Sequence, residues 1–265
     1  MIIDRILFHN KLFRIRKLSL QSYQFIRYGR TAPRLFKIIW VDPHDICEYS
    51  YRIPPSWNPI LRTFGHIKGG RWDTIQWDNI KNDIDYWKDF LKPFGIEPSS
   101  VNSFSDISTE VNYFKRIVAG RFNETIFYQS LFKHFNDKVP WTNTEFVSKC
   151  LDDDPIQWSN CESESDVIKK CNEIDGLYKK IKNNGYKTRV QVGKNKYTKH
   201  GLDEILVDID RDGKLLFING RHRLAIAKIL NLDIIPVRVV CRHTIWQSER
   251  TDLIKNDSAT KHPDV

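Results

Sequence analysis

The C-terminal third of the chain constrains the fold more than any other part of the sequence. Two short apolar segments, Ile205–Ile209 and Leu215–Ile218, flank an Asp212-Gly213 pair, and a third, Ile234–Val240, follows them. Runs of this length that are rich in Ile, Val and Leu predict strands, and Asp-Gly predicts a tight turn. The Arg221–Leu230 segment before the third run has helical spacing. The sequence therefore predicts a small α/β sheet with a helix that crosses over it.

The rest of the chain is mostly helical by its apolar spacing. Apolar and aromatic residues recur at helical intervals over 83–90, over 105–135 and over 165–184. Two segments predict additional strands, Phe36–Val41 and the alternating Lys187–Val192. We therefore expect an α+β protein, with a mostly helical, aromatic-rich N-terminal region and a small C-terminal α/β sheet domain.

Charge and polarity divide the chain into four parts. The polar, acidic stretch 151–165 is the clearest boundary, because domain linkers are exposed and polar. We expect a basic amphipathic arm over 1–40, a mostly helical region over 41–160, the sheet domain over 161–250 and a polar tail over 251–265.

The positive charge of the chain is concentrated in the arm. The protein has a formal net charge of +9, and residues 1–37 hold nine Lys or Arg and one Asp. Apolar residues lie between these cations with loosely helical spacing. Such a segment suits an anionic membrane surface or a nucleic acid, and it equally suits an ordinary amphipathic helix docked with its basic face in solvent. The sequence leaves these alternatives open, and peripheral membrane contact through residues 1–37 is one of them.

Cysteine usage and hydropathy favour a cytoplasmic protein. The five cysteines are scattered and never form a Cys-x-x-Cys pair, so that neither a disulfide framework nor a zinc site is indicated. The sequence has no apolar run of about 18 residues, the length that spans a bilayer. Charges interrupt the apolar residues at its start, which is not typical of a signal peptide.

The segment Asn219–Arg223 joins the second predicted strand directly to the helix. Cations have the wrong sign for a helix N-terminus unless an anion lies there, because the helix dipole is positive at that end. Backbone N–H groups at a helix start and guanidinium forks are good phosphate donors. We therefore predict a phosphate site in which the N–H groups of Gly220 and Arg221 are donors, and its members are Asn219, Gly220, Arg221, His222 and Arg223. The alternative is a simple turn followed by a solvated first helical turn.

Carboxylates and a second histidine extend this hypothesis to catalysis. Strand alternation places Asp208 and Asp210 on one face, where they could share a Mg²⁺ ion, and Asp208 with His222 would be the catalytic pair. His243 follows the last strand and could join His222 in binding phosphate. Half-solvated strand carboxylates and a buried histidine are the ordinary alternatives. The loop Gly65–Asp73 is typical of a binding loop or of a turn that covers the core.

The order of strand, glycine turn, basic helix start and strand resembles the ParB/sulfiredoxin-like superfamily. The likeness covers about residues 184–247. In partition proteins of this family the turn reads Gly-Glu-Arg-Arg and binds a nucleoside triphosphate, and Gly220 and Arg223 match it. In sulfiredoxins the turn reads Gly-Cys-His-Arg, which Gly220, His222 and Arg223 match. Arg221 stands where sulfiredoxins have their catalytic cysteine, which excludes sulfinic-acid repair.

The resemblance implies a nucleotide or nucleic-acid ligand held by its phosphates. A free-serine kinase branch of the family uses a carboxylate as base, for which Asp203, Glu204 and Asp208 are candidates. Standalone members are described as nucleases, so the resemblance implies Mg²⁺-dependent phosphoryl transfer or phosphodiester hydrolysis if the protein is an enzyme. The competing hypothesis is a non-catalytic ligand sensor or scaffold, attached through its basic arm to a membrane or a nucleic acid.

Overall fold

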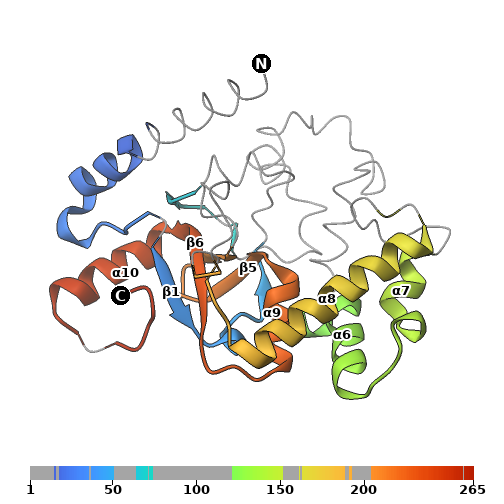
Figure 1. The fold of residues 1–265 in the computed structure, drawn as a ribbon. Helices are drawn as coiled ribbons and strands as arrows, with labels where there is room; N and C mark the ends of the chain where they lie inside the picture. Colours follow the sequence, from blue (N-terminus) through green and yellow to red (C-terminus); the bar gives the residue numbers. More distant parts are fainter. Residues whose placement is uncertain are drawn as a thin grey trace, which may run out of the picture.

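The structure of the protein is a computed structural model, whose fold is shown in Figure 1. The residues that it describes are 15, 18–35, 37–50, 64–70, 72–73, 121–151, 161, 163–188, 191–192, 204–258 and 260–265. The helices expected over 83–90 and 105–120 lie outside these residues, as does the acidic segment 152–160.

A six-stranded mixed sheet forms the centre of the described structure. Its strands are β1 (Ile38–Val41), β2 (Glu48–Tyr49), β3 (His66–Lys68), β4 (Ile205–Ile209), β5 (Leu215–Asn219) and β6 (Ile235–His243). They follow the order β1-β6-β4-β5-β2, and β3 pairs with the last part of β6. With the helices around it, this sheet confirms the expected α+β class.

The longest strand, β6, organises the sheet. It runs parallel to β4, with Ile205 opposite Val237 and Ile209 opposite Arg242. The first half of β6 pairs antiparallel with β1, and its last three residues pair parallel with β3. On its other edge β4 forms an antiparallel hairpin with β5. The hairpin turn contains Gly213, whose φ is +86°, as the Asp-Gly pair predicts.

Strands from distant parts of the chain build this one sheet. β1 comes from the end of the segment assigned to the arm, and β2 and β3 come from the region expected to be mostly helical. The sheet therefore extends beyond residues 161–250. An apolar pattern indicates that a segment is a strand, but it does not indicate which strand will be its neighbour.

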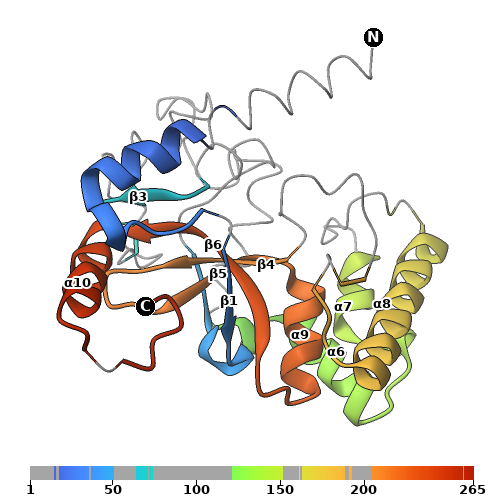
Figure 2. The ribbon, with the colours of Figure 1, turned by 60° about the vertical axis from the view of Figure 1, so that its left-hand side comes forward.

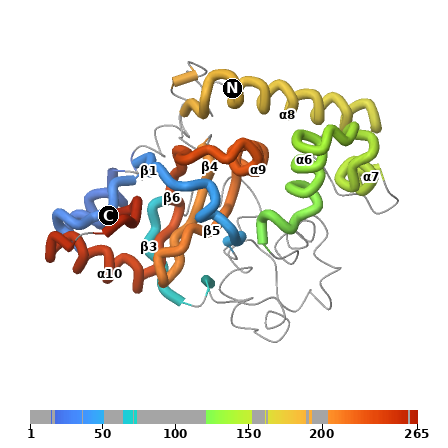
Figure 3. The backbone as a smooth tube through the Cα atoms, turned by 90° about the horizontal axis from the view of Figure 1, so that it is seen from below, coloured from blue at the N-terminus to red at the C-terminus, as the bar shows by residue number. Residues whose placement is uncertain are grey.

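Helices lie at both ends of this sheet. The α-helices are α6 (Ile126–Asn136), α7 (Glu145–Cys150), α8 (Glu164–Asn184), α9 (Arg221–Ile229) and α10 (Thr244–Lys255), and the 3₁₀ helices are η1 (Gly29–Thr31), η2 (Pro43–Asp45), η6 (Phe122–Glu124) and η7 (Trp141–Asn143). Residues 18–28 form a further helix, called helix 18–28 below. Figures 1 and 3 show α6 to α9 together at one end of the sheet and α10 with helix 18–28 at the other. Within the described ranges, no helix is long and apolar enough to cross a membrane.

Both faces of β4 are buried, which accounts for its continuous apolar sequence. The main core contains these residues of β4 and α9: Ile205, Val207, Ile209, Leu224, Ala225, Ile226 and Ala227. Leu206 points to the other face of the sheet and packs with Phe64 and Val240. Because side chains alternate along a strand, Asp208 lies on the face of Leu206, away from α9.

The helices predicted over 165–184 and 221–230 and the three strands predicted after residue 204 are confirmed with small changes at their ends. α9 begins at Arg221 as expected, and the last strand continues to His243. α8 begins at Glu164 because Ser163 is its N-cap, with an Oγ that accepts the N–H of Asp166 at 3.2 Å.

The strand expected over Lys187–Val192 is wrong for the residues described there. Thr188 Oγ1 accepts the N–H of Gln191 at 3.2 Å, and the side chain of Gln191 accepts the N–H of Thr188 at 2.8 Å. The N–H of Val192 donates to the carbonyl of Thr188 at 3.1 Å. These local bonds close a turn, because Thr and Gln side chains offer the backbone an alternative to strand pairing.

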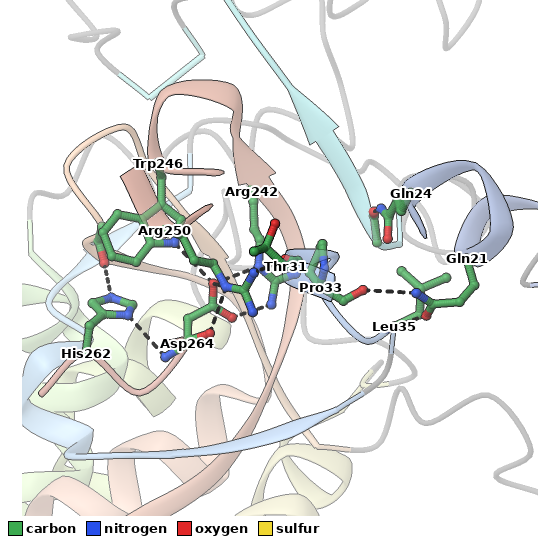
Figure 4. A network of polar contacts seen from close by, with 12 residues as sticks. Gln21, Gln24, Thr31, Pro33, Leu35, Arg242, Trp246, Arg250, His262 and Asp264 are labelled. Carbon is green, nitrogen blue, oxygen red and sulfur yellow. Dashed lines mark hydrogen bonds and ion pairs between the residues drawn. The ribbon is translucent and has the colours of Figure 1, made fainter. Parts of the chain in front are cut away.

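The segment expected to be a polar tail folds back onto the protein. α10 continues to Lys255, and the carboxylate of Asp264 lies buried between Arg242 and Arg250, as Figure 4 shows. Arg242 Nε donates to its Oδ2 at 2.8 Å, and Trp246 Nε1 donates to the same oxygen at 3.1 Å. Buried ion pairs therefore attach this segment to β6 and α10.

Candidate functional site

Gly220 forms the junction between β5 and α9. Its φ is +94°, a conformation that residues with a side chain rarely adopt. A Cβ at this position would lie 3.0 Å from the Cα of Ile205 in β4. Both observations require glycine here. The N–H of Gly220 donates to Oδ1 of Asn219 at 2.7 Å. This N–H and the Asn219 side chain therefore form a local turn, where we had expected two phosphate donors.

The three polar residues that open α9 do not point to one place, because successive helical residues are about 100° apart around the axis. The guanidinium of Arg221 lies over the ring of Phe127 in α6, 4.6 Å from the ring centre. The ring of His222 meets the same ring edge-on, with centroids 5.3 Å apart. Arg221 and His222 therefore contact α6, and the structure does not bring them together with Arg223 around one phosphate.

Arg223 instead lies beside a buried carboxylate. Its Nη1 donates to Oε2 of Glu204 at 3.3 Å, and Glu204 is only 2% exposed. Burial lowers the pKa of Arg238 in β6, and the charge of Glu204 partly offsets that effect. Glu204 thus interacts with two arginines at once.

A cavity of about 400 Å³ lies next to Arg223, a size typical of small-molecule sites. It is formed by the end of α8, the segment that follows α8 and the first turn of α9. The residues that line it are Leu177, Lys180, Ile181, Asn184, Gly185, Tyr186, Lys187, Gln191, Val192 and Arg223. Among the described residues of the predicted turn, only Arg223 reaches this cavity.

The charge of the cavity is positive. Lys180 and Lys187 are exposed cations on its wall. The C-terminus of α8 contributes about half a negative charge and the N-terminus of α9 about half a positive one, which offset each other. The lysines therefore set the net sign, and the cavity attracts anions.

Apolar and amide groups complete the cavity wall. Leu177, Ile181 and Val192 supply apolar surface, and Tyr186 supplies an aromatic ring. Asn184 and Gln191 add side-chain amides that donate and accept hydrogen bonds. This combination suits an anion that carries an apolar or aromatic portion.

The two carboxylates predicted to hold a metal have different contacts. Asp208 is completely buried, and its Oδ2 accepts the hydroxyl of Ser50 at 2.7 Å. Asp210 Oδ1 accepts the N–H groups of Asp212 and Lys214 at 2.9 and 2.7 Å, which closes the β4–β5 turn. Burial raises the pKa of Asp210. In the part of the chain that the structure describes, no three His, Cys, Asp or Glu side chains form a group suited to a metal ion.

His243 is a buried structural residue. Its Nδ1 accepts the N–H of Ile245 and so caps α10, and its Nε2 lies 2.9 Å from the carbonyl of Gly70. Because Nδ1 accepts, Nε2 is the protonated nitrogen and donates to Gly70. The ring also lies 5.7 Å from that of Trp72. These contacts are those expected of the alternative, a buried and hydrogen-bonded histidine.

The loop Gly65–Asp73 is attached to the β4–β5 turn. The guanidinium of Arg211 pairs with both oxygens of Asp73, at 2.8 and 2.9 Å. Burial alone would raise the pKa of Asp73, but Arg211 holds it below its usual value. In the described part of this loop, Trp72 is buried against Leu216 and Cys241 of the sheet.

Arg223 and His243 lie at opposite ends of β4. Gly220 contacts Ile205, the first residue of the strand, whereas Arg242 pairs with Ile209, its last. Four residues of strand span about 13 Å. The structure therefore does not bring His243 to His222, and Asp208 lies on the face of the sheet away from α9.

The sequence did not reveal Lys180 and Lys187 as site residues. Lysines near the end of α8 are what a helix dipole favours at any helix C-terminus, so their presence carried no specific signal. Only the packing of α8 against α9 places them near Arg223.

Comparisons of the chain with protein-family models, with curated proteins and with solved structures gave no match.

Proposed function

We propose that the protein binds a phosphate-bearing small molecule, such as a nucleotide, in the cavity between α8 and α9. The observation that carries this proposal is the convergence of Lys180, Lys187 and Arg223 on one cavity. A guanidinium presents a fixed fork to a phosphate, and two ammonium groups balance its remaining charge. The aromatic and apolar part of the wall fits the base or another uncharged part of the ligand.

The order of elements supports a relationship to the ParB/sulfiredoxin-like superfamily. β4, β5, the Gly220 turn, α9 and β6 follow one another as the resemblance implies. The chain departs from the family at Arg221, which lies over Phe127 and takes the position of the partition-protein glutamate or the sulfiredoxin cysteine. Of the residues matched in the turn, Arg223 is the one that we assign to the ligand.

We propose binding without turnover. Among the described residues, Glu204 is the carboxylate beside Arg223, and it is engaged in an ion pair at 3.3 Å. A general base needs access to the reacting group, whereas Glu204 is 2% exposed. Asp208 and His222, the predicted catalytic pair, contact Ser50 and Phe127 respectively. These contacts favour the ligand-sensing alternative.

A thermal-shift panel tests the proposal. The parent protein is heated with ATP, CTP, GTP, ADP or pyrophosphate, each with and without Mg²⁺. A ligand at about a hundred times its Kd raises the melting temperature of a protein of this size by about 5–10 °C. We expect at least one of these ligands to do so, and the variant K180Q/K187Q to lose most of that shift.

The matched control is K169Q/K179Q, which removes the same charge from exposed positions of α8 outside the cavity. We expect it to keep the full shift. The lysines are a better choice than Arg223, because loss of Arg223 would leave Glu204 without one of its cations and would destabilise the fold. The proposal is wrong if no ligand stabilises the parent, or if both double variants lose the shift equally.

A further inference from the structure

Helix 18–28 rests on the protein through polar side chains. Gln24 is only 1% exposed, and its Nε2 donates to the carbonyl of Gly65. Gln21 Oε1 accepts the N–H of Leu35 at 3.0 Å. Figure 4 shows both glutamines pointing from the helix toward the body of the protein. Amide hydrogen bonds thus anchor the inner face of this helix.

The outer face of the same helix is apolar. The exposed fractions are 67% for Leu18, 62% for Phe25 and 83% for Ile26, and Ile15, about one turn earlier, is 63% exposed. Residues spaced by three, four, seven or eight positions share one side of a helix. An amphipathic helix on a globular protein ordinarily buries such a face. Helix 18–28 is therefore docked through polar side chains, and its apolar side chains lie in solvent, as does Arg27.

This orientation is fixed by contacts at the end of the helix. The 3₁₀ turn η1 follows helix 18–28, and the carbonyl of Thr31 in η1 accepts a hydrogen bond from Nη1 of Arg250 in α10. The hydroxyl of Thr31 also lies 3.3 Å from that of Thr251. Figure 2 shows the helix beside β3 and close to α10. The apolar side chains are thus held outward by a helix that is attached at both its middle and its end.

Exposed cations lie at the end of helix 18–28 and in the segment that follows it. Arg27, Arg30, Arg34 and Lys37 are all exposed. Arg27 Nη1 donates to the hydroxyl of Tyr23 at 2.9 Å, and Tyr23 is itself 54% exposed. Residues 1–37 hold nine cations and one anion in sequence. A partner for this surface must therefore offer both negative charge and an apolar interior.

We propose that helix 18–28 is a membrane-docking surface, which inserts Leu18, Phe25 and Ile26 among the lipids of an anionic bilayer while the arginines bind lipid phosphates. A helix with apolar groups on one side and Lys or Arg nearby is the usual interfacial membrane binder. A nucleic acid would use the cations, but its phosphate backbone gives no place for four aliphatic and aromatic side chains. A symmetric pairing of two copies would bring the same cations together and would be repulsive.

Vesicle flotation tests this proposal with the full chain. We expect the parent to float with vesicles of phosphatidylcholine and phosphatidylglycerol, and at least about tenfold less with phosphatidylcholine alone, because each cation near an anionic surface strengthens binding severalfold. The variant F25S/I26S should lose about tenfold or more of its binding to the anionic vesicles. The variant R27Q/R30Q/R34Q should lose the preference for anionic lipid.

The matched control is F132S/I234S, which removes two apolar side chains that are 39% and 57% exposed elsewhere on the molecule. It should bind vesicles as the parent does. Light scattering after gel filtration and a duplex DNA titration complete the test. The proposal is overturned if the parent does not float, or if F25S/I26S floats like the control. It is also overturned if the parent forms a dimer or binds DNA and F25S/I26S abolishes that interaction.

Discussion

At the residue scale, the sequence predicts the turn in the segment Asn219–Arg223 but not the directions of the side chains that follow it. The sequence predicts the turn at Asn219-Gly220 between strand and helix, and the structure has glycine there with a positive φ, which other residues rarely adopt. The prediction was incomplete for the three polar residues that follow, because it treated neighbours in sequence as neighbours in space. On a helix, residues two positions apart, such as Arg221 and Arg223, point to nearly opposite sides. Arg221 and His222 contact Phe127, whereas Arg223 lines the cavity.

Replacement of Gly220 tests the geometry of this junction. G220A forces a left-handed conformation on alanine and places a methyl group against the backbone of Ile205. We expect a loss of about 1–3 kcal/mol in the free energy of unfolding. The control is G176A within α8, where a Cβ meets nothing within 4 Å, and it should stabilise by about 0.5–1 kcal/mol. Urea unfolding measures both, and equal effects of the two variants would contradict the account.

At the element scale, local signals predicted the helices and central strands well. Gly185 ends α8 and the Asp212-Gly213 pair forms a tight turn, and both signals act within a few residues. The N-cap of α8 is Ser163, not Ser165 as the sequence predicts. The wrong predictions concern segments whose conformation depends on a distant contact or on side-chain hydrogen bonds. Thr188 closes a turn that alternation alone predicts as a strand. Asp264 attaches a polar segment to β6 and α10 through Arg242 and Arg250. The sequence around these arginines does not indicate that Asp264 is their partner.

The buried carboxylate of Asp264 makes a prediction about stability and pH. Burial alone would raise its pKa, but Arg242 and Arg250 hold the pKa of Asp264 below its usual value. The ion pairs therefore stabilise the protein above about pH 4, the pKa of an unfolded aspartate, and that contribution is lost as the pH falls through the lower folded pKa. D264N should cost about 3 kcal/mol at neutral pH.

Urea unfolding of the parent and of D264N from neutral pH to acid measures this contribution. The difference between the two should be constant near neutral pH and should shrink in acid. D252N, which changes an exposed carboxylate of the same helix α10, should behave as the parent. A difference between parent and D264N that persists unchanged in acid would show that the ion pairs are not its source.

At the scale of the whole molecule, the sheet unites strands from both ends of the described sequence. β6 pairs with β1 and β3 as well as with β4, so the C-terminal unit is completed by strands that precede it by well over a hundred residues. Strand pairing over such separations depends on the global fold, which a single sequence does not reveal. The same holds for the cavity, because Lys180 and Lys187 become site residues only when α8 packs on α9.

Binding of a phosphate group between α8 and α9 is tested most directly by amide NMR spectra of the isotope-labelled protein during a pyrophosphate titration. We expect saturable shifts concentrated in residues 184–187, 191–192 and 221–223, which are absent in K180Q/K187Q and retained in K169Q/K179Q. Shifts confined to the basic segment before residue 38, or shifts that do not saturate, would contradict the claim.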